Sequence, residues 1–182
     1  MSTAANCLVI VLELIGLYIS ISDRHWTILA YYTQISNLIT LASSVCLLAL
    51  GSGAFTGGLR YLSTCMLTMT FLITLFVLVP MGGGFRKLML SGNGLYHHTL
   101  CPLISAASYI LWEEHNSVIL LPVIITLVYG VTMLVMNNRY LFDGPYPFFR
   151  VHNQSRTATV MWTAVLIIII AAISCGISAV AK

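Results

Sequence analysis

Six stretches of mostly apolar residues follow one another along the chain, separated by short polar or Gly- and Pro-bearing segments. Each stretch has close to the about 20 residues that a helix needs to cross the hydrocarbon core of a bilayer. The pattern therefore predicts six membrane-spanning helices, at residues 3–21, 28–50, 61–79, 96–112, 118–136 and 158–180.

The composition supports this fold class and excludes two others. Of the 182 residues 59% are hydrophobic and 7% are charged, and the mean hydropathy is +0.95. A soluble domain carries about 25% charged residues, and a disordered chain combines low hydrophobicity with high net charge. Six spans and their loops use the whole length, so we expect an all-α bundle that forms one transmembrane domain over residues 1–182.

The eight Lys and Arg residues are unevenly divided between the predicted loops. Six of them lie in the first, third and fifth loops, whereas only Arg60 and Lys182 lie elsewhere. Because basic loops stay in the cytoplasm, this division places the odd-numbered loops inside and both termini outside. Basic residues this sparse exclude a nucleic-acid-binding surface. Short loops and no targeting signal favour a multi-pass protein of a bacterial cytoplasmic membrane.

The predicted second span opens on polar residues, which are costly in hydrocarbon unless they are paired. Thr33, Ser36 and Asn37 are spaced so that they share one face of a helix. Residues of these types often hold membrane helices together through hydrogen bonds, and that interpretation stays open. The other interpretation is chemical: the Thr33 hydroxyl is a nucleophile, provided that a base lies near it.

The predicted fourth span opens on a second polar stripe, because Asn93, His97 and Cys101 recur every fourth residue. The second and fourth spans run in the same direction, so Thr33 and His97 fall at similar depth near the basic face. An imidazole at that depth can take the hydroxyl proton as the oxygen attacks a carbonyl. Haem ligation is disfavoured, because the other histidines lie at span ends or in loops.

Two further polar segments receive simpler interpretations. Tyr146, Phe148 and Phe149 flank two prolines in the fifth loop, which is typical of an aromatic belt at the membrane interface. Residues 113–115, Glu-Glu-His, are predicted to form a solvated turn on the opposite face.

Glu13, inside the predicted first span, is expected to face the bundle and to pair with a donor such as an Asn or a His.

Three short segments, in order along the chain, carry a family resemblance. They are residues 32–38 (Tyr-Thr-Gln-Ile-Ser-Asn-Leu), the pattern Asn93-x-x-x-His97-x-x-x-x-Pro102, and residues 146–148 (Tyr-Pro-Phe). Together they resemble the androgen-induced membrane proteins, six-span threonine hydrolases that cleave fatty acid esters of hydroxy fatty acids, and their bacterial six-span relatives. The likeness covers the number and order of spans, whereas residue identity is confined to these segments.

The resemblance implies Thr33 as the nucleophile and His97 as its base. His98 is the alternative base, because a shift of one residue exchanges the two histidines. His97 is favoured because it keeps Asn93 and Pro102 in register with the family pattern.

The sequence therefore predicts an intramembrane hydrolase of lipid esters, with the fatty acyl chain lying among the spans. From their spacing, Asn37 or Gln34 is expected to donate to the oxyanion, and Asn93 is expected to orient His97. This chemistry requires no metal and no cofactor, and its partners are the bilayer and a lipid substrate. The head group or carboxylate of the substrate is expected to meet the basic residues Arg24, Arg86, Lys87 and Arg150.

Two other functions remain open from the sequence. Cys101 lies one helical turn from His97, which leaves a Cys–His membrane acyltransferase as an alternative. Glu13, Asn37 and His97 are instead able to line a polar path through a small transporter, channel or helper subunit. A purely structural membrane protein is the simplest alternative.

Overall fold

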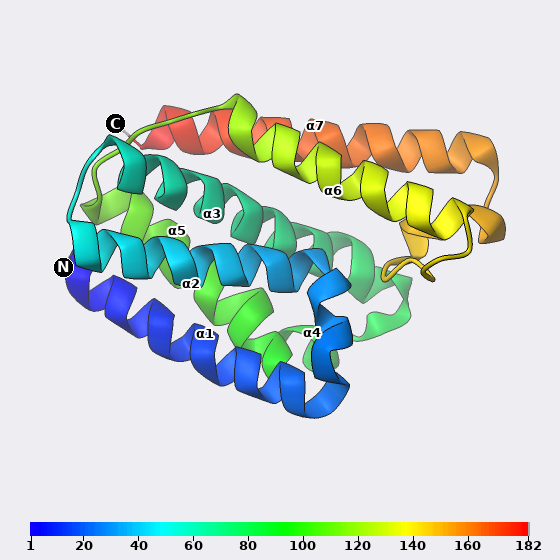
Figure 1. The fold of residues 1–182 in the computed structure, drawn as a ribbon, viewed down its shortest axis with the longest axis horizontal. Helices are drawn as coiled ribbons and strands as arrows, with labels where there is room; N and C mark the ends of the chain where they lie inside the picture. Colours follow the sequence, from blue (N-terminus) through cyan, green and yellow to red (C-terminus); the bar gives the residue numbers. More distant parts are fainter. Residues whose placement is uncertain (182) are drawn as a thin grey trace.

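The computed structural model describes residues 1–181, with the side chains of residues 24–26 outside the description. All regular structure in residues 1–181 is helical, which confirms the predicted all-α class, and the helices pack side by side as a bundle (Figure 1). The elements are α1 (Ser2–Arg24), η1 (His25–Ala30), α2 (Tyr32–Leu50), α3 (Ala54–Ile73), η2 (Thr74–Gly83), α4 (Phe85–Met89), η3 (Leu95–Leu100), α5 (Cys101–Trp112), α6 (Leu120–Asn138), η4 (Pro147–Phe149), η5 (Val151–Asn153) and α7 (Arg156–Val180).

Five helices in the described part of the chain are long and apolar enough to cross a membrane, as in a multi-pass membrane protein. The predicted count of six is not confirmed, because two shorter elements, η3 and α5, occupy the place of the fourth span. The 12 residues of α5 alone rise only about 18 Å. The five long helices are Ser2–Asp23, Tyr32–Leu50, Ala54–Gly83, Leu120–Asn138 and Arg156–Val180.

The boundaries of two predicted spans differ from the structure for identifiable reasons. The second span begins at Tyr32 rather than at residue 28, because Tyr31 is extended and separates η1 from α2. The third begins at Ala54 rather than at residue 61, so Arg60 lies inside α3 and not in a loop. The sequence pattern predicts that the span begins only after Arg60, because an unpaired charge is costly in hydrocarbon. In the structure this charge is paired with Glu113.

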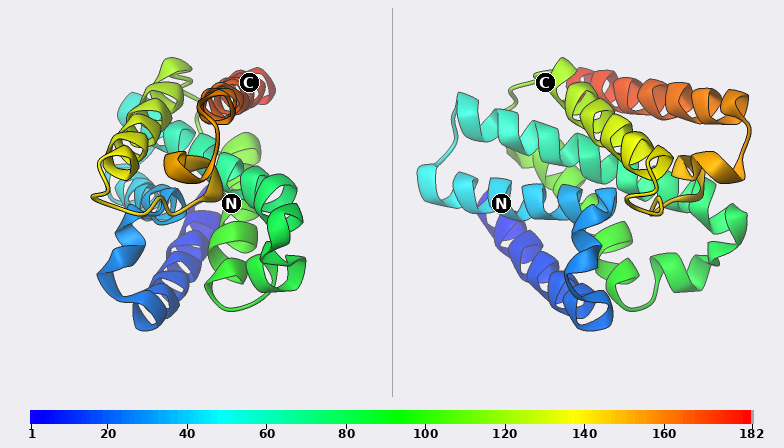
Figure 2. Two further views of the ribbon diagram at one scale, coloured as in Figure 1. Left: turned by 90° about the vertical axis from the view of Figure 1, so that its right-hand side faces the viewer. Right: turned by 45° about the vertical axis from the view of Figure 1, so that its right-hand side comes forward.

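The helices are arranged in layers around α3, which contacts α2, α5, α6 and α7. Figure 2 shows α6 and α7 together on one side of the bundle and α1 on the opposite side. Both termini lie at one end of the molecule (Figure 1). The other end, which we call the basic end, carries α4 and the loop between α6 and α7. Thr33 lies near this end, because α2 begins there.

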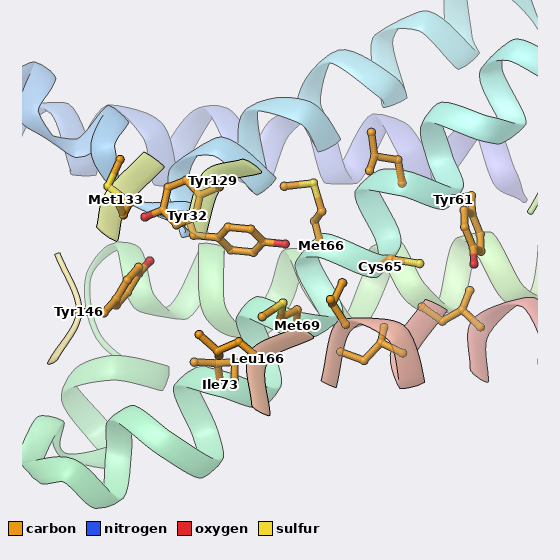
Figure 3. Close-up of a cluster of buried hydrophobic side chains, with 14 of the residues drawn as sticks. Tyr32, Tyr61, Cys65, Met66, Met69, Ile73, Tyr129, Met133, Tyr146 and Leu166 are labelled. Carbon is orange, nitrogen blue, oxygen red and sulfur yellow. The ribbon is translucent and has the colours of Figure 1, made fainter. Parts of the chain in front are cut away.

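The buried core and the outer surface are both apolar, as expected of a bundle in lipid. Large apolar side chains such as Val11, Val128 and Ile168 are exposed on the outside of α1, α6 and α7. The interior cluster between α3, α6 and α7 combines aliphatic residues with several tyrosines (Figure 3). The tyrosine hydroxyls need partners when buried, and their partners define the first part of the site.

Candidate active site

Two tyrosine hydroxyls hold the first turn of α2 and thereby position Thr33. The first N–H groups of a helix have no partner inside the helix. Here the Tyr32 N–H donates to the Tyr129 hydroxyl at 3.1 Å, and the Thr33 N–H donates to the Tyr146 hydroxyl at 3.3 Å. The Thr33 and Tyr146 hydroxyls are also hydrogen-bonded to each other, 3.2 Å apart. Tyr146 therefore contacts both the backbone and the side chain of Thr33.

Tyr146, Phe148 and Phe149 are buried, with 8%, 4% and 5% of their surfaces exposed, so their interpretation as an interfacial belt is wrong. The rings pack on one another, with the Tyr146 and Phe148 centroids 5.2 Å apart, and the Tyr129 ring lies against Phe149. This folded loop lies over the start of α2. Burial raises the pKa of Tyr146 above its ordinary value of about 10, so the phenol stays protonated at neutral pH.

Thr33 and Tyr146 line a cavity between α2, α3, α6 and α7. Its empty space, including the part that opens to the surroundings, is about 620 Å³. Figure 3 shows Tyr146 and Tyr32 at one end of this core region and Met69, Ile73 and Leu166 beside them. Its apolar walls are formed by Met69, Ile73, Leu78, Leu127, Val131, Leu134, Phe148, Phe149, Leu166 and Ile167.

His97 lies in a different environment, which we call the inner polar cluster: Glu13, Ser20, Gln34, Asn37, Asn93 and His97. The imidazole of His97 is fully buried. Its Nδ1 lies 3.2 Å from Gln34 Nε2, and its Nε2 lies 3.4 Å from both the carbonyl oxygen and Oε2 of Glu13. Glu13 therefore faces the bundle and pairs with a histidine, as the sequence predicts.

The hydrogen bonds of the inner polar cluster determine the tautomer of His97. Ser20 Oγ donates to the Gly16 carbonyl at 2.8 Å, so toward Gln34 it accepts, and the Gln34 group that faces it is the amide nitrogen. The same nitrogen donates to His97 Nδ1, which is therefore the acceptor of the ring. The ring proton is on Nε2, where it donates to Glu13.

Thr33 and His97 thus have different partners. The side chain of α2 that is hydrogen-bonded to His97 is Gln34, the neighbour of Thr33, whereas the Thr33 hydroxyl is bonded to Tyr146. The predicted pair of nucleophile and base stays a prediction. His98 lies outside the inner polar cluster: its Nδ1 is 2.7 Å from the Leu88 carbonyl oxygen. Of the two histidines, His97 is the one buried beside α2.

The three predicted supporting residues lie near His97, but the amide groups of their side chains donate to acceptors other than Thr33 Oγ1. Asn37 Nδ2 donates to the Thr33 carbonyl at 2.6 Å, and Gln34 Nε2 is used by Ser20 and His97. Asn93 Nδ2 donates to Ser20 Oγ at 2.9 Å, so it reaches His97 only through Ser20 and Gln34. Their predicted roles therefore remain untested.

The predicted head-group residues whose side chains are described lie at the basic end. Arg86 and Lys87 are exposed on the short helix α4. Arg150 is exposed in the loop before α7, and its Nε donates to the Gly144 carbonyl at 3.4 Å. The side chain of Arg24 lies outside the described residues.

Sequence reasoning missed a second buried polar site, at the end of the bundle that carries the termini. The solvated-turn prediction is wrong for Glu113, whose side chain is 2% exposed and accepts from Arg60 Nε at 2.8 Å. Burial acts to raise the pKa of Glu113, but the Arg60 charge and hydrogen bonds from Arg60, Ser108 and Asn6 outweigh it and lower that pKa. The available signal was a set of serines that face the guanidinium: Ser43, Ser44, Ser63 and Ser105.

Cys101, the alternative nucleophile, is buried beside the carboxyl group of Glu13. A thiolate is the reactive form of cysteine, and it is disfavoured in apolar surroundings and next to another anion. This position does not support the Cys–His alternative.

Comparison of the chain with models of known families, with curated proteins and with solved structures finds no match in any of the three. The resemblance to the androgen-induced membrane proteins therefore depends on the three sequence segments alone.

Proposed function

We propose that this protein is a membrane hydrolase of fatty acyl esters, in which Thr33 Oγ1 attacks the ester carbonyl. The observation that carries the proposal is the position of the Thr33 hydroxyl, which lines a largely apolar cavity and is hydrogen-bonded there to a second hydroxyl. A fatty acyl chain along the apolar walls is stabilised by about 0.8 kcal/mol for each buried methylene group. This arrangement brings the ester to the polar end of the cavity.

In the proposed reaction, the Tyr146 hydroxyl stabilises the negative charge that develops on the carbonyl oxygen. Because burial raises its pKa, the phenol is a hydrogen-bond donor and not a base at neutral pH. The attack forms a bond from Thr33 Oγ1 to the carbonyl carbon and breaks the bond to the leaving alcohol. The alcohol departs with the proton that Thr33 loses, and water then hydrolyses the acyl-threonine.

His97 is the proposed carrier of that proton. The lone pair on its Nδ1 faces α2, which is the correct side for a base that serves Thr33, but in this structure the Gln34 amide occupies it. Proton transfer therefore requires the Gln34 amide to leave Nδ1 when substrate binds. Hydrogen bonds of this kind often form only in the substrate complex.

In the membrane, we propose that η3 and α5 together complete the sixth crossing. The Asn116 side chain, which follows α5, donates to the carbonyl of Ala54 at the start of α3, so the chain has returned to the end from which α3 departs. The proposed setting is a bacterial cytoplasmic membrane with the basic end in the cytoplasm. Arg86, Lys87 and Arg150 then lie where a lipid head group or carboxylate lies.

A small transporter, channel or helper subunit is the second candidate. The observation that favours it is the inner polar cluster, which places a carboxyl group and a histidine deep inside a bundle of apolar helices. Transport of a solute into proteoliposomes, without turnover of any ester, would select this candidate.

The direct experiment measures hydrolysis of fluorogenic fatty acyl esters and labelling by a fluorophosphonate in the purified protein. We expect Thr33→Ala to lower turnover by about 10³-fold or more, as removal of a nucleophile does, and to abolish labelling, whereas Thr33→Ser keeps part of both. His97→Ala is expected to lower turnover as well. Mass spectrometry should locate the adduct on Thr33.

Thr132→Ala is the matched control, because the Thr132 hydroxyl on α6 is exposed and donates to Val128 within its own helix. Turnover in this variant should equal that of the unaltered protein. Turnover and labelling that survive both Thr33→Ala and His97→Ala contradict the proposed function.

A further inference from the structure

Three oxygen atoms of the inner polar cluster have no hydrogen-bond partner among the described residues: Glu13 Oε1, Gln34 Oε1 and Asn37 Oδ1. Their residues are 1%, 4% and 2% exposed, and all three line one small pocket between α1, α2 and η3. Gln34 and Asn37 are three residues apart on α2 and share a face, and Glu13 comes from α1, which packs against α2. Buried polar groups are normally paired, so three unpaired oxygens on residues that line one pocket indicate a ligand.

Each of these oxygens is held as an acceptor by the contacts at the other end of its own side chain. Gln34 Nε2 donates to Ser20 and His97, so the carbonyl oxygen of that amide points away from them. Asn37 Nδ2 donates to the Thr33 carbonyl, which cannot donate in return. Glu13 Oε2 faces the N–H of His97, so Oε1 is the carboxyl oxygen that has no hydrogen-bond partner among the described residues. The pocket therefore presents acceptors, and its ligand must be a donor or a cation.

The size of the pocket decides between a hydrogen-bond donor and a cation as its ligand. Its empty space, including the part open to the surroundings, is about 160 Å³, but it has no room for a water-sized sphere. A buried water needs about 10–15 Å³ of such space. A proton on Glu13 can pair that oxygen with only one of the two amide oxygens. A cation can pair with more than one acceptor at a time, and oxygen atoms are the ligands that hard cations prefer.

The charges around the pocket also favour a single positive charge. Of the groups near Glu13, His97 is held as a neutral tautomer, and Cys101 is a buried thiol that contacts the Glu13 carboxyl group without neutralising it. Arg60, on α3, also acts electrostatically on Glu13, but it is paired with Glu113. One carboxylate without a neutralising partner is costly inside a membrane bundle, and a monovalent cation neutralises it.

We propose that Glu13, Gln34 and Asn37 bind one small monovalent cation through these three oxygens, and that Na⁺ is preferred over K⁺. K⁺ is nearly as large as a water molecule, whereas Na⁺ is smaller, so the pocket selects by size. The bound ion joins α1 to α2 and holds the Gln34 amide on His97. The site does not depend on the proposed function, because none of its oxygens lines the cavity at Thr33.

The test is thermal unfolding of the purified full chain in detergent, with NaCl replaced by KCl or choline chloride at constant ionic strength. We expect a saturable rise of Tm with Na⁺, a smaller rise with K⁺ and none with choline, because a ligand of the native state stabilises it by mass action. Glu13→Gln and Asn37→Ala should remove the Na⁺-dependent rise. Thr33→Ala should keep it.

Asn6→Ala is the matched control. Asn6 is a fully buried asparagine on α1 that also has an unpaired Oδ1, but its amide nitrogen bonds to Glu113 at the Arg60 site. This variant should unfold at a lower temperature and still respond to Na⁺. If the variants do not fold, binding of radioactive ²²Na⁺ to the unaltered protein, displaced by NaCl more readily than by KCl, supports the site.

An equal Tm in Na⁺ and choline, together with no bound ²²Na⁺, overturns the proposal. A Tm that rises only with acid assigns the pocket to a proton and overturns it too. A full Na⁺ response in Glu13→Gln would move the ion away from this carboxylate, with the same consequence.

Discussion

At the scale of single residues, the buried guanidinium of Arg60 is held by one carboxylate and by four serine hydroxyls from three helices. Both oxygens of Glu113 are used: Oε2 by Arg60, and Oε1 by Arg60, Asn6 and Ser108. Removal of one partner from a buried ion pair leaves the other charge uncompensated. This site therefore stabilises the contact between α3 and α5.

We predict that Glu113→Gln lowers the free energy of unfolding by about 3–5 kcal/mol at neutral pH. The pKa of Glu113 in the folded protein is lower than its ordinary value of 4.5, so the contribution of its charge is complete above about pH 4.5. That contribution is lost as the pH falls through the folded pKa. Denaturant unfolding of both proteins at a series of pH values is the measurement, and the difference between them should shrink in acid. A difference that does not change with pH contradicts this assignment.

A second prediction at this scale concerns Tyr146. Tyr146→Phe removes the proposed donor to the oxyanion and leaves the ring, so we expect kcat to fall by about 10²–10³-fold, as for other oxyanion donors. Esterase kinetics with a soluble ester measure it. Tyr140→Phe is the control, because the Tyr140 ring is exposed and stacks on His152. Equal kcat values for Tyr146→Phe and the unaltered protein would remove Tyr146 from the mechanism.

At the scale of the elements, the contact between α1 and η3 depends on Gly16. A Cβ atom at this position would collide with the imidazole of His97, so only glycine lets the ring lie against α1. The same approach brings His97 Nε2 to Glu13, which precedes Gly16 by about one helical turn. The packing of these two elements therefore sets the position of the histidine.

We predict that Gly16→Ala destabilises the protein by about 1–3 kcal/mol, as overpacking of a core does, and displaces His97. The measurements are denaturant unfolding and the NMR signal of the His97 ring. Gly176→Ala on α7 is the control: a Cβ there meets no atom within 4 Å, so the better helix propensity of alanine should leave stability equal or slightly higher. A Gly16→Ala protein as stable as the control would show that α1 and η3 are not closely packed.

The elements themselves were largely predictable, because hydrophobic length is a local property. The predicted span at 158–180 matches α7 closely, and the span at 118–136 matches α6 within two residues. The third span differs from the prediction where a polar residue is satisfied by a distant partner. The local pattern predicts a loop at Arg60. In the structure Glu113, far away in the sequence, makes the burial of Arg60 inside α3 possible.

At the scale of the whole molecule, the path of the chain between its two ends determines the topology. The loop after α2, residues 51–53, and the segment after α5 lie at the end that carries the termini, and α4 lies at the basic end (Figure 1). The short elements η3 and α5 connect these two ends. Whether they cross a bilayer is open to a direct test.

We predict that cysteines placed at Ser52 and Glu114 react with a membrane-impermeant maleimide from one side of the membrane, and a cysteine at Ser91 from the other. All three positions are exposed in connecting segments. Labelling of right-side-out and inverted vesicles, in a background without the five native cysteines, is the measurement. A cysteine at position 114 that reacts from the same side as one at position 91 would mean that η3 and α5 do not cross.

The sequence by itself determined the all-α class, the apolar helices and their approximate ends, since each follows from about 20 neighbouring residues. It also indicated that residues 33–37 and His97 are unusual for a membrane helix. Only the tertiary structure decided which side chains meet: Thr33 with Tyr146, and His97 with Gln34 and Glu13. The physical reason is that these contacts depend on how each helix is rotated about its axis and on how closely it packs. Residues such as Gly16 and Arg60 influence that packing through partners that are distant in the chain: His97 for Gly16 and Glu113 for Arg60.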